Sequence, residues 1–120
     1  MEPSILKTIR NMMVGEIYAD DESAFDDELI LHINTYLSYL NQLGCGVEGF
    51  QITGPNEEWS DFIPDPNGTL LGLVKTFIWA KVKIAFDSRS SSTLLQSINQ
   101  IADETAWRIN LIVDRAKNVT

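Results

Sequence analysis

The sequence predicts a mainly α-helical fold, an antiparallel bundle of about four helices around one central apolar helix. Residues 68–87, GTLLGLVKTFIWAKVKIAFD, form the most apolar run in the chain and contain no proline. Leucine and isoleucine recur at helical spacing on both sides of this run, over residues 27–43 and 93–117. With 120 residues, 44% of them hydrophobic, the chain fits one domain, residues 1–120, that buries about two-thirds of its unfolded surface.

The central helix is expected to touch several neighbours, because apolar residues cover well over half of its circumference. These residues are Leu70, Leu73, Val74, Phe77, Ile78, Ile84 and Ala85, and the polar strip holds Gly72, Lys75, Thr76 and Lys83. Lys81 breaks the apolar side, and its stem is expected along the edge of the core with the ammonium group reaching out. Trp79 projects from the polar strip, so it either lies under a loop or anchors a partner.

The first half of the chain predicts two helices separated by acidic residues. The first runs from about Ser4, its N-cap, to Val14, and Gly15 stops it. The acids of residues 16–28 precede the second helix, where the helix dipole favours carboxylates, and their spacing does not match a calcium loop. The second helix spans residues 27–43. Its core-facing stripe consists of Leu29, Ile33, Tyr36, Leu37, Leu40 and Leu43, with His32 on its flank.

Between the second helix and the central one, the sequence becomes rich in glycine and loses the helical spacing of apolar residues. Glycines surround Phe50-Gln51-Ile52-Thr53, which predicts a single strand or one arm of a small hairpin. Because an isolated strand is unstable, it would pair with Gly46-Val47 or with another copy of the chain. Residues 55–63 predict one or two helical turns capped by Asn56. Their apolar residues, Trp59, Phe62 and Ile63, would form a plug, and residues 64–68 a rigid turn.

The last helix, residues 93–117, carries apolar residues on two sides. The core-facing stripe is expected to contain Leu94, Ile98, Ile101, Ala102, Ile109 and Ile112. Trp107 and Leu111 lie on the opposite side among polar residues, four positions apart, with no reason within the chain to be there. They are therefore a candidate contact surface.

The charge distribution separates the chain into two halves. Between Asn11 and Val74 there are twelve acidic residues and no lysine or arginine, whereas residues 75–120 hold seven basic and four acidic residues. A net charge of −8 without a basic stripe disfavours sequence-specific binding of nucleic acid. The opposite signs suit head-to-tail contact between copies, or two halves that neutralise each other within one fold.

The sequence lacks the residues of a catalytic or metal site. There is one histidine, His32, and one cysteine, Cys45, and no phosphate-binding glycine loop. We therefore expect no catalytic residues, no cofactor and no metal. The N-terminal residues lack the apolar core of a signal peptide, and Lys75, Lys81 and Lys83 interrupt the most apolar segment. The chain is expected to be soluble, without a membrane partner, and to be made in the cytoplasm.

Several strings together resemble the small head-tail connector proteins of tailed bacteriophages, also called head-completion or adaptor proteins and often grouped with DNA packaging. The strings are ILKTI at Ile5, FDDELILHIN at Phe25, LNQLGCGVEGF at Leu40, WSDFI at Trp59, LVKTFIWAKVKIAFD at Leu73 and TAWRIN at Thr105. They cover nearly the whole chain and are packing motifs. One departure is Ser88-Arg89-Ser90, where members of the family have prolines after the Phe-Asp corner.

The resemblance implies a structural protein of the virion or of a prophage-encoded particle. Copies would form a ring, a dodecamer, below the portal protein at the head-tail junction, made in the host bacterial cytoplasm. The ring would extend the DNA channel and offer a docking surface to tail-completion proteins. The competing interpretation is a small acidic helical regulatory or inhibitor protein of the nucleic-acid mimic type, and a helical metal-free enzyme is a more distant one. A measured mass, alone and with portal protein, would separate a ring-forming protein from a monomeric regulator.

A ring needs complementary surfaces on each subunit, and the sequence offers candidates for both. We expect Trp107 and Leu111, with Trp79 as a further candidate, to form an apolar anchor at the subunit boundary. Around them, Arg108, Arg115 and Lys117 are expected to approach acids of residues 16–28 on the next copy.

Overall fold

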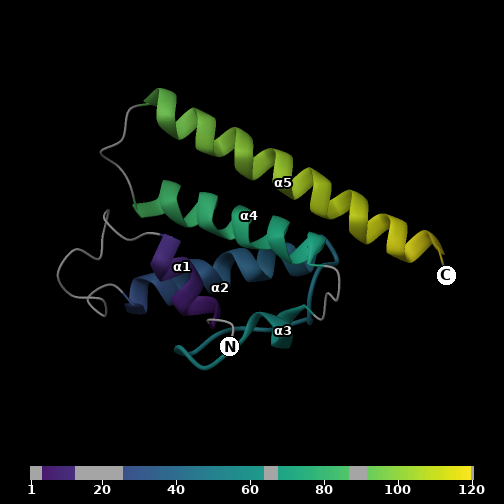
Figure 1. Cartoon of the computed structure of the whole chain (residues 1–120), viewed down its shortest axis with the longest axis horizontal. Coiled ribbons are helices and arrows are strands. Elements are labelled where there is room, and N and C mark those ends of the chain that lie inside the picture. The colour runs from purple at the N-terminus through teal and green to yellow at the C-terminus, as the bar shows by residue number, and fades with distance from the viewer. Residues whose placement is uncertain (1–3, 13–25, 64–67, 87–91, 120) are drawn as a thin grey trace.

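The computed structural model of the chain describes residues 4–12, 26–63, 68–86 and 92–119. These contain five helices: α1 (Ile5–Met12), α2 (Asp26–Gln42), α3 (Trp59–Phe62), α4 (Thr69–Phe86) and α5 (Ser92–Val119). No strand occurs in the described ranges, and the predicted mainly helical fold is confirmed. Figure 1 shows α5, α4 and α2 running side by side with alternating direction.

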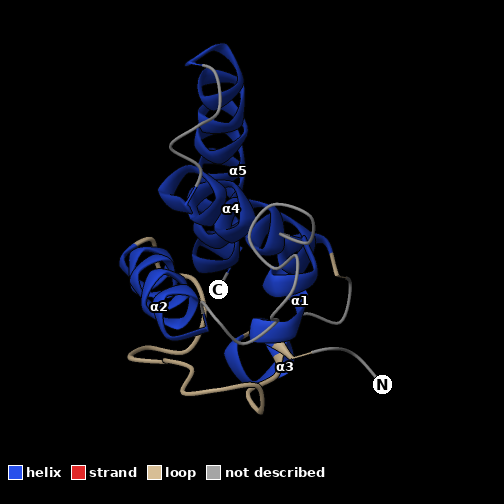
Figure 2. Ribbon diagram, turned by 90° about the vertical axis from the view of Figure 1, so that its left-hand side faces the viewer, coloured by secondary structure: helices blue, strands red, loops and turns tan. Residues whose placement is uncertain are grey.

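Helix α4 lies at the centre, as its apolar sequence predicts. It contacts α5 on one side and both α1 and α2 on the other (Figures 1 and 2). Its side chains Val74, Phe77, Ile78, Ala80 and Val82 are buried. The predicted polar strip is partly wrong, because Lys83 is only 8% exposed while Ala85 is exposed. Neighbours on two opposite sides leave little of the helix facing solvent, and a lysine can bury its aliphatic stem there.

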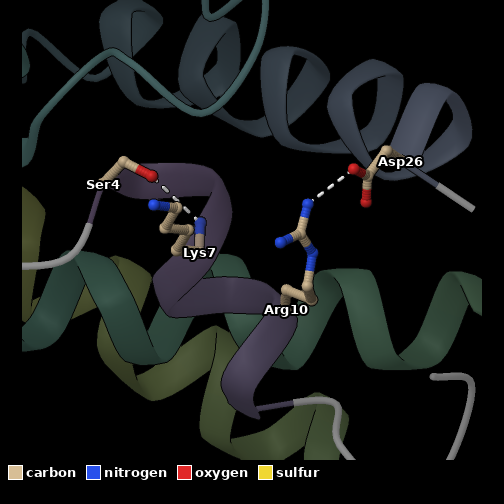
Figure 3. A network of polar contacts seen from close by, with 4 residues as sticks. All are labelled: Ser4, Lys7, Arg10 and Asp26. Carbon is tan, nitrogen blue, oxygen red and sulfur yellow. Dashed lines mark hydrogen bonds and ion pairs between the residues drawn. The ribbon is translucent and has the colours of Figure 1, made fainter. Parts of the chain in front are cut away.

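Helix α1 begins as predicted. The Ser4 hydroxyl accepts a hydrogen bond from the backbone N–H of Lys7 at 3.2 Å, which satisfies one of the free donors of the first turn. Ile5 and Ile9 are buried beneath it. Arg10, in its last turn, forms an ion pair with Asp26 at the start of α2 (Figure 3). The predicted end of this helix, Val14 and Gly15, lies outside the described residues.

Helix α2 buries the face that the sequence predicts. Leu29, Ile33, Leu37 and Leu40 are fully buried, and Gly44 follows with a φ of 90°, a conformation that glycine adopts easily at a helix end. The Phe77 ring of α4 lies against two tyrosines of α2. Its centroid is 6.3 Å from that of Tyr36, edge to face, and 5.4 Å from that of Tyr39, stacked. The α2 and α4 faces therefore meet through aromatic side chains.

The strand predicted at residues 50–53 is not present, and residues 43–58 form an irregular connection. The side chain of Asn34 on α2 replaces the missing partner strand. Its amide group donates to the Ile52 carbonyl at 3.0 Å and accepts from the Ile52 N–H at 2.8 Å. Asn41, two turns later, bonds in the same way to Cys45, Val47 and Gly49. Periodicity could not reveal this, because two side-chain amides satisfy the backbone without a second strand.

The predicted plug is confirmed, although its cap is not. Trp59, Phe62 and Ile63 are 1%, 0% and 5% exposed. Trp59 and Phe62 lie in helix α3, and Ile63 follows as its C-cap. The helix begins after Glu58 rather than at Asn56, and the Asp61 carboxylate accepts the Glu58 N–H at 2.9 Å. The Trp59 indole N–H donates to the Thr8 hydroxyl at 2.9 Å, so α3 is fastened to α1. The turn predicted at residues 64–67 lies outside the described residues.

Helix α5 is the longest, and it packs mainly against α4. A single stripe is buried, formed by Ile98, Ala102, Thr105, Ile109 and Val113. Two residues predicted to face the core are exposed instead, Leu94 by 45% and Ile101 by 38%. Because α5 has one helix as its main neighbour, only a narrow stripe of its own surface is buried, and residues at the margin of that stripe remain accessible.

Candidate interaction surface

The most exposed aromatic side chain in the described residues is Trp107, on the side of α5 opposite the buried stripe. It is 62% exposed, and Leu111, one turn later on the same side, is 38% exposed. The backbone places them there because the stripe Ala102, Thr105, Ile109 fixes which face of the helix meets α4. An exposed indole beside an exposed leucine is typical of a surface that binds another protein.

Basic residues surround this apolar pair. Arg108 forms an exposed ion pair with Glu104, one turn earlier on α5, at 3.2 Å. Such a pair in water contributes little to stability, so the Arg108 guanidinium can exchange partners at small cost. Arg115 is exposed one turn beyond Leu111. The side chain of Lys117 lies outside those described.

Trp79, the third predicted anchor, is in a different environment. It lies on α4, is partly buried and packs against the core. Only part of its indole is therefore accessible to a partner. Trp107 and Leu111 therefore lie together on the exposed face of α5, whereas Trp79 is partly buried in the interior.

The acids that were expected to meet these basic residues are described only from Asp26 onward. Asp26 is engaged by Arg10 within the chain. Asp27 and Glu28 are exposed in the first turn of α2. The remainder of the acidic stretch, residues 16–25, lies outside the described residues.

Sequence reasoning missed a second exposed apolar surface, on α2. Leu31 is 66% exposed and Tyr39 is 42% exposed. An open hollow of about 500 Å³ lies beside them, bordered also by Thr35, Ser38 and Gln42. The signal was present, because Leu31 falls outside the buried stripe of α2 just as Trp107 falls outside that of α5.

The described residues provide little for chemistry. They contain no group of three or more histidine, cysteine or acidic side chains placed to hold a metal ion. Cys45 is 1% exposed, and burial raises the pKa of its thiol to about 11, which leaves it a poor nucleophile at neutral pH. The exposed features are an apolar pair, a hollow and charges, which are typical of surfaces that bind other macromolecules. No helix in the described ranges has the length and apolar character needed to cross a membrane.

Comparison with known protein families gives one match. A family model described as phage connector protein matches residues 5–116, which is nearly the whole chain. The matched region includes every described helix in whole or in greater part, and both exposed surfaces. Comparison with curated proteins and with solved structures finds no match.

Proposed function

Because the chain belongs to the phage connector protein family, we propose that it is a subunit of the head-tail connector of a tailed bacteriophage. In this role it forms a ring, a dodecamer, below the portal protein in the virion or in a particle encoded by a prophage. The ring extends the channel through which DNA passes and gives tail-completion proteins a surface on which to dock. The subunit is made in the host bacterial cytoplasm and is not an enzyme.

The observation that carries this proposal, besides family membership, is the exposed pair on α5. Trp107 and Leu111 project away from the face that packs on α4, so they contribute little to the contact between these two helices. An indole contributes strongly to binding when a partner removes it from water. We propose that this pair is the apolar anchor of the subunit boundary, with Trp79 contributing its accessible edge.

The charges support a channel role and an oriented contact. Between Asn11 and Val74 the chain has no lysine or arginine, and an acidic lining does not hold phosphate groups, so DNA can slide past it. On α5, Arg108, Arg115 and Lys117 form the basic side of the subunit boundary, opposite acids of residues 16–28 on the next copy. These charges steer and orient the subunits, while the desolvated indole supplies most of the affinity.

A mass measurement tests the proposal. The purified chain is examined by native mass spectrometry and multi-angle light scattering, alone and after mixing with the purified portal protein of the phage that encodes it. We expect a complex in which a closed ring of twelve copies is bound to the portal. A chain that stays monomeric at high concentration and does not bind the portal would contradict the proposal and favour a monomeric regulator.

A further inference from the structure

The exposed apolar residues of α2 belong to a regular row along the helix. Asp27, Leu31, Thr35 and Tyr39 follow one another at intervals of four residues, and all four are exposed. Residues at this spacing form one of the ridges by which helices pack together. The row begins with a carboxylate and continues with apolar or weakly polar side chains. It borders the hollow beside Leu31 and Tyr39.

Helix α5 carries a matching row on its outward side. Asp103, Trp107, Leu111 and Arg115 are also four residues apart, and all are exposed. Here the two apolar residues lie between charges of opposite sign. Successive members of either row are separated by about 6 Å along the axis, as in any α-helix, so what distinguishes these two rows is the order of their apolar and charged side chains.

We propose that the α5 row of one copy packs antiparallel on the α2 row of the next copy in the ring. This inference rests on the proposed function and names the second surface of the subunit boundary. Leu111 then lies on Leu31, the Trp107 indole covers the hollow at Thr35 and Tyr39, and Arg115 meets Asp27. The indole, removed from water over the hollow, is the main source of affinity.

The charges decide the direction of the two helices. In the antiparallel arrangement the Arg115 guanidinium faces the Asp27 carboxylate, and Asp103 faces Tyr39, away from the acidic first turn. In the parallel arrangement Asp103 would face Asp27, and the two like charges would repel each other. Charge complementarity of this kind selects one orientation and suppresses the other. Arg115 belongs to the same row as Trp107 and Leu111, whereas Arg108 does not, so Arg115 is the cation that the row itself brings to Asp27.

The geometry of the subunit favours a second copy as the partner. Helices α2 and α5 lie on opposite sides of α4 (Figures 1 and 2), so the two rows cannot meet within one chain. Each copy therefore offers the α5 row to one neighbour and the α2 row to the other. Contacts between two different surfaces of identical subunits close into a ring when the rotation allows it.

Disulfide trapping tests the pairing directly. In a Cys45→Ala background, Leu31→Cys and Leu111→Cys are combined, and the chain is assembled on portal and oxidised mildly. We expect a ladder of covalent oligomers, because the two residues face each other between neighbouring copies at a distance that a disulfide can bridge. The matched control combines Leu111→Cys with Glu48→Cys, which is exposed but outside the α2 row, and should give no ladder.

Charge reversal provides an independent test. Asp27→Arg and Arg115→Asp should each lower the assembled fraction about tenfold at low salt, and the double variant should recover most of it, as expected for a pair of facing charges. Asp103→Arg, at the far end of the α5 row, should have a much smaller effect. A double variant that assembles no better than the single variants would overturn the pairing.

The outcomes separate this inference from the proposed function. Rings that form on the portal without a Leu31–Leu111 ladder, or with a ladder in the Glu48 control of equal strength, overturn the pairing and leave the connector role in place. Wild-type chain that never associates with itself or with portal overturns both. A ladder restricted to the Leu31 and Leu111 combination, together with rescue by charge exchange, is the result that we expect.

Discussion

Helices α4 and α5 lie side by side and are both rich in apolar residues, yet they use them differently. Helix α4 has neighbours on two sides and buries residues around most of its circumference, even part of Lys83. Helix α5 has one main neighbour and buries one stripe, leaving Leu94, Ile101, Trp107 and Leu111 exposed. The number of neighbours, rather than apolar content, decides which apolar residues remain for contacts outside the chain.

The tryptophans show the same contrast at the level of single residues. Trp59 is 1% exposed, donates to the Thr8 hydroxyl, and has the Lys75 ammonium 5.6 Å from its ring centroid. Its apolar and polar parts are therefore both satisfied within the chain. Trp107 is 62% exposed. An indole with internal partners stabilises the fold, whereas an exposed one is available for assembly.

The largest expected loss of stability comes from truncating residues in the buried contact between α4 and α2. Phe77 and Leu37 are fully buried on the facing helices α4 and α2, so their truncation leaves cavities. Phe77→Ala and Leu37→Ala should each lower the free energy of unfolding by about 2 to 5 kcal/mol. Chemical denaturation monitored by circular dichroism measures this. Near-wild-type stability of both variants would show that α4 is not the central helix.

A somewhat smaller loss is expected at Gly46, where the connection after α2 passes over the plug. Its φ is +81°, and an added Cβ would lie 2.3 Å from the Phe62 ring, which is itself fully buried. Gly46→Ala should cost about 2 to 4 kcal/mol, the sum of backbone strain and overpacking. Gly49 is the matched control, with φ +76° and nothing within 4 Å. Gly49→Ala should cost only the strain, about 1 to 2 kcal/mol, and equal losses at both positions would contradict the packing argument.

A still smaller loss of stability is expected at Asn34, whose side chain forms hydrogen bonds with both backbone groups of Ile52. Asn34→Ala removes both hydrogen bonds and leaves a partly buried N–H and C=O without this partner. The free energy of unfolding should fall by about 1 to 3 kcal/mol. Thr35→Ala, at the neighbouring exposed position, is the control and should change stability by less than about 0.5 kcal/mol. Equal stability of the two variants would contradict the prediction and show that water replaces the Asn34 amide without loss of free energy.

Periodicity was sufficient to predict the helices and most of the core. The stripe Leu29, Ile33, Leu37, Leu40 and the plug at Trp59 and Phe62 follow from residue type and spacing alone. The strand at Phe50–Thr53 was predicted wrongly, because a local apolar run does not show what satisfies its backbone. That partner is Asn34, eighteen residues from Ile52, and nothing in the spacing indicates it.

The two exposed apolar surfaces, on α5 and on α2, could be predicted from the sequence only in part, for a related reason. Trp107 and Leu111 are easy to recognise in the sequence, because they lie among polar residues on one side of the helix predicted over residues 93–117. Leu31 obeys the same rule but is a single leucine next to a strongly apolar stripe, so it does not stand out. The placement of α2 and α5 on opposite sides of α4 is a tertiary property, and it was needed to recognise that their outward rows lie on different sides of the subunit.

The smallest expected effect on stability belongs to Trp107→Glu, which should have the largest effect on assembly. The side chain makes little contact with the fold, so the free energy of unfolding should change by less than about 0.5 kcal/mol. The variant should therefore be a folded subunit that does not form the ring, because a carboxylate cannot be buried in the contact without a partner. Asn99→Glu, which adds the same charge at an exposed position elsewhere on α5, should still assemble. For the wild type, raised salt should slow assembly more than it weakens the finished ring, since charges act mainly on encounter. Scattering and denaturation on the same samples separate the two properties. Unfolding of Trp107→Glu would place the indole in the core of its own subunit and remove the distinction between the two tryptophans.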